Sequence, residues 1–251
     1  MDTPQQLLQY FQDTISDDTT NWPNLITATR GLNIFFERAK RKNADETYQI
    51  IASPIMGVKE NRDISDRESF DIFTSHRKRT SNYLKNKDAD YFTKVDYADM
   101  VIDDFTNAFE LDKKLLVRLV CIDRLLNDKE PDIENLYFQN AGRLLTELAQ
   151  SCNDWRFWTD LLDRRIRNAA SHLDFYYDEK SQIFRGKDTV KVKYKGKTRK
   201  KANRFSISPE EFLYETLPNA INAGQSFWAA GILLCLEPYS EYYNQALVML
   251  G

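Results

Sequence analysis

An arginine and a histidine five positions apart, Arg167 and His172, are the residues of this chain best suited to chemistry. Asn168 follows the arginine directly, and the segment has the sequence Arg-Asn-Ala-Ala-Ser-His. A histidine can take up and release protons near neutral pH. An arginine presents a planar, permanently charged fork that pairs with phosphate oxygens. Because the chain has only two histidines, this segment is the first candidate for a reactive site.

These side chains suit the cleavage of RNA without a metal ion. A base must take the proton of the ribose 2′-hydroxyl, and an acid must protonate the departing 5′-oxygen. Positive charge must stabilise the phosphorane-like transition state. We expect His172 to move the protons, Arg167 to hold the phosphate, and Asn168 to orient the imidazole or bind a phosphate oxygen. The sequence therefore predicts a catalytic set of Arg167, Asn168 and His172 that needs no metal and no cofactor.

The R-x4-H spacing, with a polar residue after the arginine, resembles the signature of the HEPN family, many of whose members are metal-independent RNases. The resemblance covers about Val95 to Glu237. It implies an all-α, HEPN-like helical bundle and an endoribonuclease that leaves a 2′,3′-cyclic phosphate and a 5′-hydroxyl. It also implies a setting in prokaryotic toxin–antitoxin, antiviral defence or CRISPR-linked systems, with an antitoxin or another defence protein as a partner. Some toxins of the family carry a regulatory tyrosine two positions after the histidine, where this chain has Asp174.

A short motif of this kind also arises by chance. In that case Arg167 is a surface arginine, and His172 is a C-terminal helix residue that interacts with the helix dipole. Two further interpretations remain open at this point. One is a non-catalytic helical scaffold that uses the motif for dimerisation, and the other is a regulator that binds nucleic acid without cutting it.

The motif occurs once, which bears on the assembly of the protein. The other histidine, His76, has Asp71 rather than an arginine five positions before it. One arginine and one histidine make a sparse active site, whereas two motifs face to face would place two of each around one phosphate. We therefore expect a two-fold symmetric homodimer with a composite active site. The resemblance implies the same arrangement.

Apolar residues recur with helical spacing along most of the chain, so we expect helices to position the motif. The small numbers of glycine and proline, 8 and 7, disfavour an all-β fold. The motif would close a long helix whose apolar stripe consists of Leu162, Ile166, Ala169 and Leu173. The expected helices cover about residues 7–15, 21–42, 65–84, 95–109, 112–126, 133–152, 155–173, 210–223 and 227–237.

Apolar residues alternate with lysines between about residues 181 and 207, which predicts a β-hairpin. The segment from Arg185 to Arg204 carries ten basic residues and one acidic residue, while the whole chain has a net charge of −3. Such asymmetry is typical of a surface for a polyanion, although a charged edge that resists aggregation is an alternative. We expect the hairpin to contact RNA beside the active site through Lys191, Lys193, Lys195, Lys197, Arg199, Lys200 and Lys201.

The polar stretch from Lys85 to Asp90 is the best candidate for a domain boundary. It would separate an additional N-terminal helical region (1–88) from the HEPN-like domain (89–251), unless both share one core. The three cysteines lie far apart and suggest reduced thiols. The chain shows neither a signal peptide nor an apolar run of 18 residues. We therefore expect a cytoplasmic protein without a membrane partner.

The segment Glu134–Gln139 has the sequence Glu-Asn-Leu-Tyr-Phe-Gln, which matches the recognition site of a plant-virus protease used to remove tags. An engineered site is one explanation. A native origin is favoured because Ile133, Tyr137 and Ala141 continue the helical period across the segment. Asn140 also stands where that protease site normally has glycine or serine.

Overall fold

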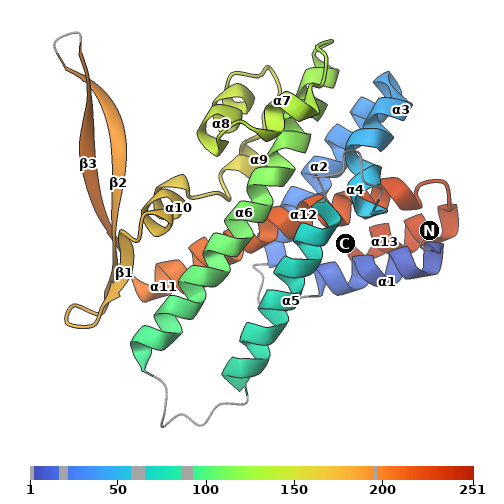
Figure 1. The fold of residues 1–251 in the computed structure, drawn as a ribbon. Coiled ribbons are helices and arrows are strands. Elements are labelled where there is room, and N and C mark those ends of the chain that lie inside the picture. Colours follow the sequence, from blue (N-terminus) through green and yellow to red (C-terminus); the bar gives the residue numbers. More distant parts are fainter. Residues whose placement is uncertain (1–2, 17–21, 58–65, 86–92, 195–196) are drawn as a thin grey trace.

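The computed structural model describes residues 3–16, 22–57, 66–85, 93–194 and 197–251. Helices make up most of this part of the chain, and a small antiparallel sheet stands at one side of the helical body (Figure 1). The prediction of a mainly helical fold with a β-hairpin is confirmed at this level.

The elements follow one another in an order that keeps the sheet between two groups of helices. The first group is α1 (Pro4–Ile15), α2 (Trp22–Lys42), α3 (Ala44–Thr47), the π-helix η1 (Tyr48–Ala52), α4 (Ser53–Ile55), α5 (Asp66–Lys85), α6 (Lys94–Leu126), α7 (Ile133–Tyr137), α8 (Ala141–Ala149), α9 (Arg156–Thr159) and α10 (Arg164–Ser171). The strands are β1 (Phe175–Asp178), β2 (Ile183–Tyr194) and β3 (Lys197–Ile207). The closing helices are α11 (Pro209–Glu211), the π-helix η3 (Phe212–Thr216), α12 (Leu217–Leu236) and α13 (Ser240–Met249).

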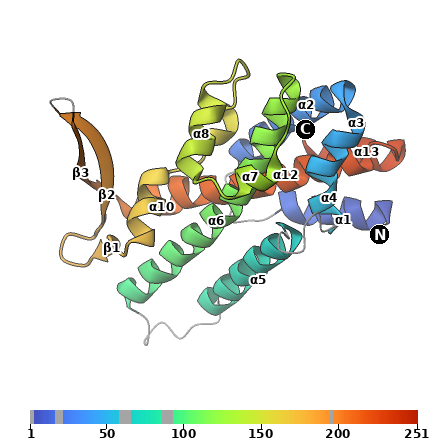
Figure 2. The ribbon, with the colours of Figure 1, turned by 45° about the horizontal axis from the view of Figure 1, so that its top comes forward.

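Helix α12 is the centre of the hydrophobic core. It is buried on every side from Ala220 to Leu234, as expected for a mainly apolar helix at the centre of a bundle. Helices α1, α2 and α6 pack against it (Figures 1 and 2). One hydrophobic cluster therefore includes side chains from both sides of the 85–90 stretch. Residues 86–90 of that stretch lie outside the described residues.

Helix α6 joins two segments that the sequence analysis separated. It runs without interruption for 33 residues, through the break expected between residues 109 and 112. No glycine or proline occurs in it, and a capping box between Thr93 and Asp96 starts it. Similarly, α12 continues through Gly224 where two helices were expected, and the residues after Glu237 form α13, where no helix was expected.

Two long helices expected from the sequence are each divided into two shorter ones. The expected helix 133–152 divides into α7 and α8, because the Asn140 side chain accepts a hydrogen bond from the Arg143 backbone N–H (3.0 Å) and starts a new helix. Asp163 divides 155–173 in the same way and begins α10. Helical period is thus not maintained across Glu134–Gln139, and the Phe138 ring is exposed. The argument from periodicity for a native origin of that segment was wrong.

The sheet has the order β1-β2-β3, with both pairs antiparallel. The hairpin expected at 181–207 is confirmed as β2 and β3, and β1 adds a strand that the sequence analysis did not predict. Phe175, Phe184 and Phe212 pack ring against ring beneath the base of the sheet, with centroids 4.6 to 5.6 Å apart. The Phe205 ring lies against Gly186, and a side chain at that position would displace the ring. These contacts attach the hairpin base to the helical body.

Candidate functional site

Helix α10, which carries Arg167 and Asn168, lies between the sheet and α6. It packs against β1, β2 and α6, and both ribbon views show it at this junction (Figures 1 and 2). Ile166 and Ala169 are fully buried on its inner face. The helix is therefore fixed in place, and its polar residues point toward its neighbours or solvent.

The motif does not close a long helix, because α10 has only eight residues. His172 is its C-cap residue, and Leu173 follows with a positive φ of 57°. The Leu173 N–H donates to the Ala170 carbonyl (3.0 Å) and the Asp174 N–H to the Ala169 carbonyl (2.8 Å), which is a Schellman turn. Leu173 is 92% exposed, so its expected place in the apolar stripe was wrong. The turn directs the chain from α10 into β1.

The His172 imidazole is exposed. Within the described part of the chain, it has no hydrogen bond and no ion pair. The other histidine differs, because the Nδ1 atom of His76 lies 2.9 Å from the Oδ1 atom of Asp104, a buried carboxylate. His172 is thus open to a ligand or to another protein copy, whereas His76 is already engaged.

Arg167 is held by a carboxylate of α6. Its Nε and Nη2 atoms both donate to the Oε1 atom of Glu110, at 3.0 and 2.5 Å. The two side chains remain 26% and 46% exposed, respectively. Pairs with this exposure are worth about 0–1 kcal/mol, so a phosphate could displace the carboxylate at little cost. Glu110 therefore fixes the arginine side chain without making it inaccessible.

Asn168 points to the sheet. Its Nδ2 atom lies 3.4 Å from the Oδ1 atom of Asp188 on β2, a long hydrogen bond to a buried carboxylate. The expected set of Arg167, Asn168 and His172 thus lies on one short element. Within it, the arginine is tied to α6, the asparagine contacts β2, and the histidine is exposed.

Two groups near the motif were not singled out from the sequence. Glu110 precedes Arg167 by 57 residues, and no local pattern could reveal that pairing. Lys187 is the second: its backbone N–H donates to the Asp174 carbonyl (3.1 Å), and its Nζ atom lies 3.5 Å from the Asp174 carboxylate. This contact ties β2 to the turn that follows His172. The overall basic character of the hairpin was the only signal for it.

The expected RNA-binding cations belong to both strands of the hairpin. Arg199 and Lys201 are exposed on β3 and share a strand face with Phe205 and Ile207, because residues two apart lie on the same face. The backbone of β2 pairs Lys191 with Lys200, Lys193 with Thr198, and Tyr194 with Lys197. The side chains of Lys191, Lys193, Lys197 and Lys200, and the whole of Lys195, lie outside the part that the structure describes.

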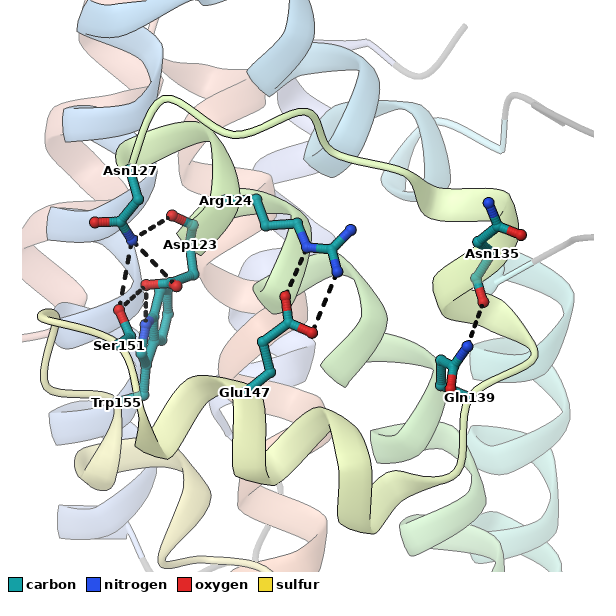
Figure 3. A network of polar contacts seen from close by, with 8 residues as sticks. All are labelled: Asp123, Arg124, Asn127, Asn135, Gln139, Glu147, Ser151 and Trp155. Carbon is teal, nitrogen blue, oxygen red and sulfur yellow. Dashed lines mark hydrogen bonds and ion pairs between the residues drawn. The ribbon is translucent and has the colours of Figure 1, made fainter.

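A second polar cluster, centred on Asp123, lies at the C-terminal end of α6 (Figure 3). The Asp123 carboxylate is 5% exposed and accepts hydrogen bonds from Trp155 Nε1 (2.8 Å), Ser151 Oγ (2.5 Å) and Asn127 Nδ2 (3.2 Å). Beside it, Arg124 donates to both carboxylate oxygens of Glu147, at 2.6 and 3.2 Å. The Asp123 carboxylate is therefore satisfied by its neighbours, which makes this a structural cluster.

The described residues contain no group of three or more histidine, cysteine or acidic side chains arranged to hold a metal ion. Over the same residues, no helix combines the length and the apolar character needed to cross a membrane. No known protein family, no curated protein and no solved structure matches the chain. Its function must therefore be argued from the site itself.

Proposed function

We propose that this protein is a metal-independent endoribonuclease of the HEPN type, whose active site forms when two copies bring their α10 helices together. The observation that carries the proposal is the state of His172. Its imidazole is exposed, has no partner among the described residues, and belongs to the C-cap residue of the short helix that carries Arg167. A proton carrier and a cation that can hold phosphate are the two kinds of group that RNA transesterification requires.

The reaction assigns a separate task to each histidine of the dimer. His172 of one copy takes the proton from a ribose 2′-hydroxyl, and the 2′-oxygen attacks the adjacent phosphorus. The bond between phosphorus and the 5′-oxygen breaks, and His172 of the partner subunit gives a proton to the departing oxygen. The two Arg167 side chains stabilise the charge that develops on the non-bridging oxygens. The products are a 2′,3′-cyclic phosphate and a 5′-hydroxyl.

Glu110 has a role in the free protein under this proposal. It occupies the side of Arg167 that the phosphate would take, through the contacts of Nε and Nη2. Substrate binding exchanges that carboxylate for a phosphate oxygen, which can pair with the guanidinium in a bidentate manner. The exposure of the ion pair supports an easy exchange.

The hairpin supplies contacts with the RNA backbone in this proposal. Arg199, Lys201 and Arg204 are exposed on β3. Single-stranded loops suit such a site, because their ribose and phosphate are sterically available. The resemblance to HEPN proteins suggests a cytoplasmic toxin or antiviral defence protein that an antitoxin or another defence protein restrains. The same cations would also suit a regulator that binds RNA without cutting it.

The test is cleavage of single-stranded RNA by the purified protein in the presence of EDTA. We expect wild-type protein to cut and His172→Ala and Arg167→Ala to lose about 10²- to 10⁴-fold in rate. His76→Ala is the matched control, because it removes the only other histidine of the chain. A 2′-deoxy substitution at the cleaved nucleotide should block the reaction, since the attacking hydroxyl is then missing.

The remaining outcomes separate the alternatives. Binding of RNA without cleavage by wild-type protein would replace the nuclease with an RNA-binding regulator. Neither binding nor cleavage would favour a non-catalytic scaffold. Cleavage that persists in both motif variants would identify a contaminant and contradict the proposal.

A further inference from the structure

Strand β3 forms an open edge of the sheet. The sheet has the order β1-β2-β3, and β3 lies on the outer side of β2 in both ribbon views (Figures 1 and 2). Its pairing with β2 is regular from Phe184–Ile207 to Tyr194–Lys197, without a bulge. In the described part of the chain, β3 exchanges backbone hydrogen bonds with β2 alone. Regular edges of this kind can pair with a further strand, and proteins commonly cover or interrupt them for that reason.

The backbone of Lys187 shows which groups of β3 point outward. Its N–H donates to the Asp174 carbonyl (3.1 Å), which lies at the start of β1 and therefore on the side of β2 away from β3. Lys187 pairs with Arg204. In an antiparallel ladder, pairs that exchange backbone hydrogen bonds alternate with pairs that do not. The Lys187–Arg204 pair is of the second kind, so the backbone N–H and C=O of Arg204 point away from β2. The same holds two positions away, at Ala202 and Ser206.

The charge along this edge has one sign. Strand β3 contains five basic residues and no acidic residue. Lys201 and Arg204 are exposed. The acidic groups nearby lie elsewhere: the Asp188 carboxylate of β2 is buried, and the exposed Glu210 and Glu211 follow the end of β3 at the base of the sheet. Positive charge therefore accompanies the outward backbone groups over most of the strand.

The combination of open backbone and positive charge selects the kind of partner. A second copy of this chain would place the basic residues of one β3 opposite those of the other, and like charges directly opposite one another destabilise a strand pair. A nucleic acid would pair with the cations, but it offers no row of donors and acceptors at the spacing of a strand. An extended peptide supplies both at that spacing. Acidic side chains on such a peptide would also neutralise the cations of β3.

We propose that β3 binds an extended, acidic segment of another protein, which joins the sheet as a fourth strand. The segment exchanges backbone hydrogen bonds with Ala202, Arg204 and Ser206, and its carboxylates lie beside the cations of β3. Bound in this way, it would compete with RNA for those cations. The inference does not depend on RNA cleavage, because it rests on the backbone of β3 and its charge.

The test uses the fluorescein-labelled peptide (Glu-Thr)5 with the full-length protein, and fluorescence anisotropy measures binding. We expect saturable binding of one peptide per chain and about tenfold weaker binding by Ala202→Pro. The proline removes an outward N–H and leaves the hydrogen bonds to β2 intact, and such positions of an edge strand accept proline. Ala202→Val is the matched control, because it keeps the N–H and the charge of the strand. It should bind as the wild type does.

Amide hydrogen exchange in the wild-type protein, measured by NMR, needs no variant and guards against misfolding of Ala202→Pro. Saturating (Glu-Thr)5 should slow exchange at Ala202, Arg204 and Ser206, and leave the inward amide of Asn203 nearly unchanged.

The peptide (Gln-Thr)5 has a similar backbone without the charges, and it should bind at least about tenfold more weakly. Equal binding by the proline and valine variants, or unslowed exchange at the outward amides, would show attraction by charge alone and overturn the strand pairing. Equal binding of the two peptides would overturn the acidic partner, and the lack of saturable binding would overturn both.

Discussion

Two polar clusters contact the same long helix, α6, and they differ in how far their hydrogen-bonding groups are satisfied. The Asp123 carboxylate is buried and accepts hydrogen bonds from the side chains of Asn127, Ser151 and Trp155 (Figure 3) and from that of Asn153. The Glu110–Arg167 ion pair is partly exposed, and the His172 imidazole has no partner among the described residues. The comparison indicates that the first cluster stabilises the fold, whereas the second leaves polar groups open to solvent.

The largest expected effect is a loss of stability when the Asp123 cluster is disrupted. Asp123→Ala removes the acceptor for several buried donors at once, so we expect a loss of about 3 kcal/mol in the free energy of unfolding. Urea denaturation measures it. The rate of RNA cleavage per folded molecule should stay unchanged, because no motif residue contacts this cluster. A neutral effect on unfolding would show that the Asp123 network does not stabilise the fold.

A third carboxylate of α6, Asp112, differs from Asp123 because no group donates a hydrogen bond to it in the described structure. It is completely buried, and neither oxygen has a hydrogen-bond partner in the described structure. Burial raises the pKa of Asp112 well above its usual value. The folded state therefore keeps the proton while the unfolded state loses it, and stability should fall as pH rises above about 4.

Asp112→Asn tests this, because the amide has a similar shape and cannot ionise. We expect the variant to be more stable than wild type at pH 8, by about 1–2 kcal/mol. The difference should shrink toward zero below about pH 3, where the carboxyl is mostly protonated in both states. Thermal unfolding across this pH range measures it. A difference that is constant with pH would contradict the account of Asp112.

Much of the molecule could be predicted from local sequence, and the failures have identifiable causes. The hairpin was visible because strand alternation and basic residues coincide from Arg185 to Arg204. The breaks at Asn140 and Asp163 were missed, because a capping side chain looks like any polar surface residue within a periodic segment. The unbroken α6 was divided because apolar spacing alone does not show where a helix ends.

The site was partly visible for a related reason. Arg167 and His172 share a short segment, so the sequence alone placed both at the same end of one helix, although five residues put their side chains about 140° apart round it. The Glu110 contact depends on the packing of α6 against α10, and the sequence carries no signal for it. Leu173 was assigned to the core by its apolar character, and the Schellman turn places it in solvent instead.

A smaller change in stability is expected at Leu173, in the turn that follows α10. A non-glycine residue in the left-handed region costs about 1–2 kcal/mol, and glycine is the usual residue at this position of the turn. Leu173→Gly should therefore raise the free energy of unfolding by about 1 kcal/mol, after allowance for the greater freedom of glycine in the unfolded chain. Chemical denaturation measures it. A destabilised variant would show that the exposed leucine side chain contributes to the fold.

The smallest expected effect concerns the cations of the hairpin. Arg199→Gln/Lys201→Gln should weaken RNA binding and reduce its dependence on salt, by about 0.7 in the logarithmic slope for each lost phosphate contact. Arg156→Gln is a suitable control, because this exposed arginine pairs with Asp154 away from the sheet. Binding titrations at several salt concentrations give the slopes. An unchanged slope in the double variant would remove these two cations from the proposed RNA surface.

The central claim is that two copies share one active site, and subunit mixing tests it most directly. A fixed amount of wild-type protein is equilibrated with a tenfold excess of His172→Ala, and cleavage is measured with saturating RNA, so that competition for substrate is negligible. Most wild-type chains would then pair with a variant chain that lacks one histidine. The composite site predicts that cleavage falls about tenfold. Cleavage that is unaffected by the excess variant would show that each copy acts alone and would contradict the account.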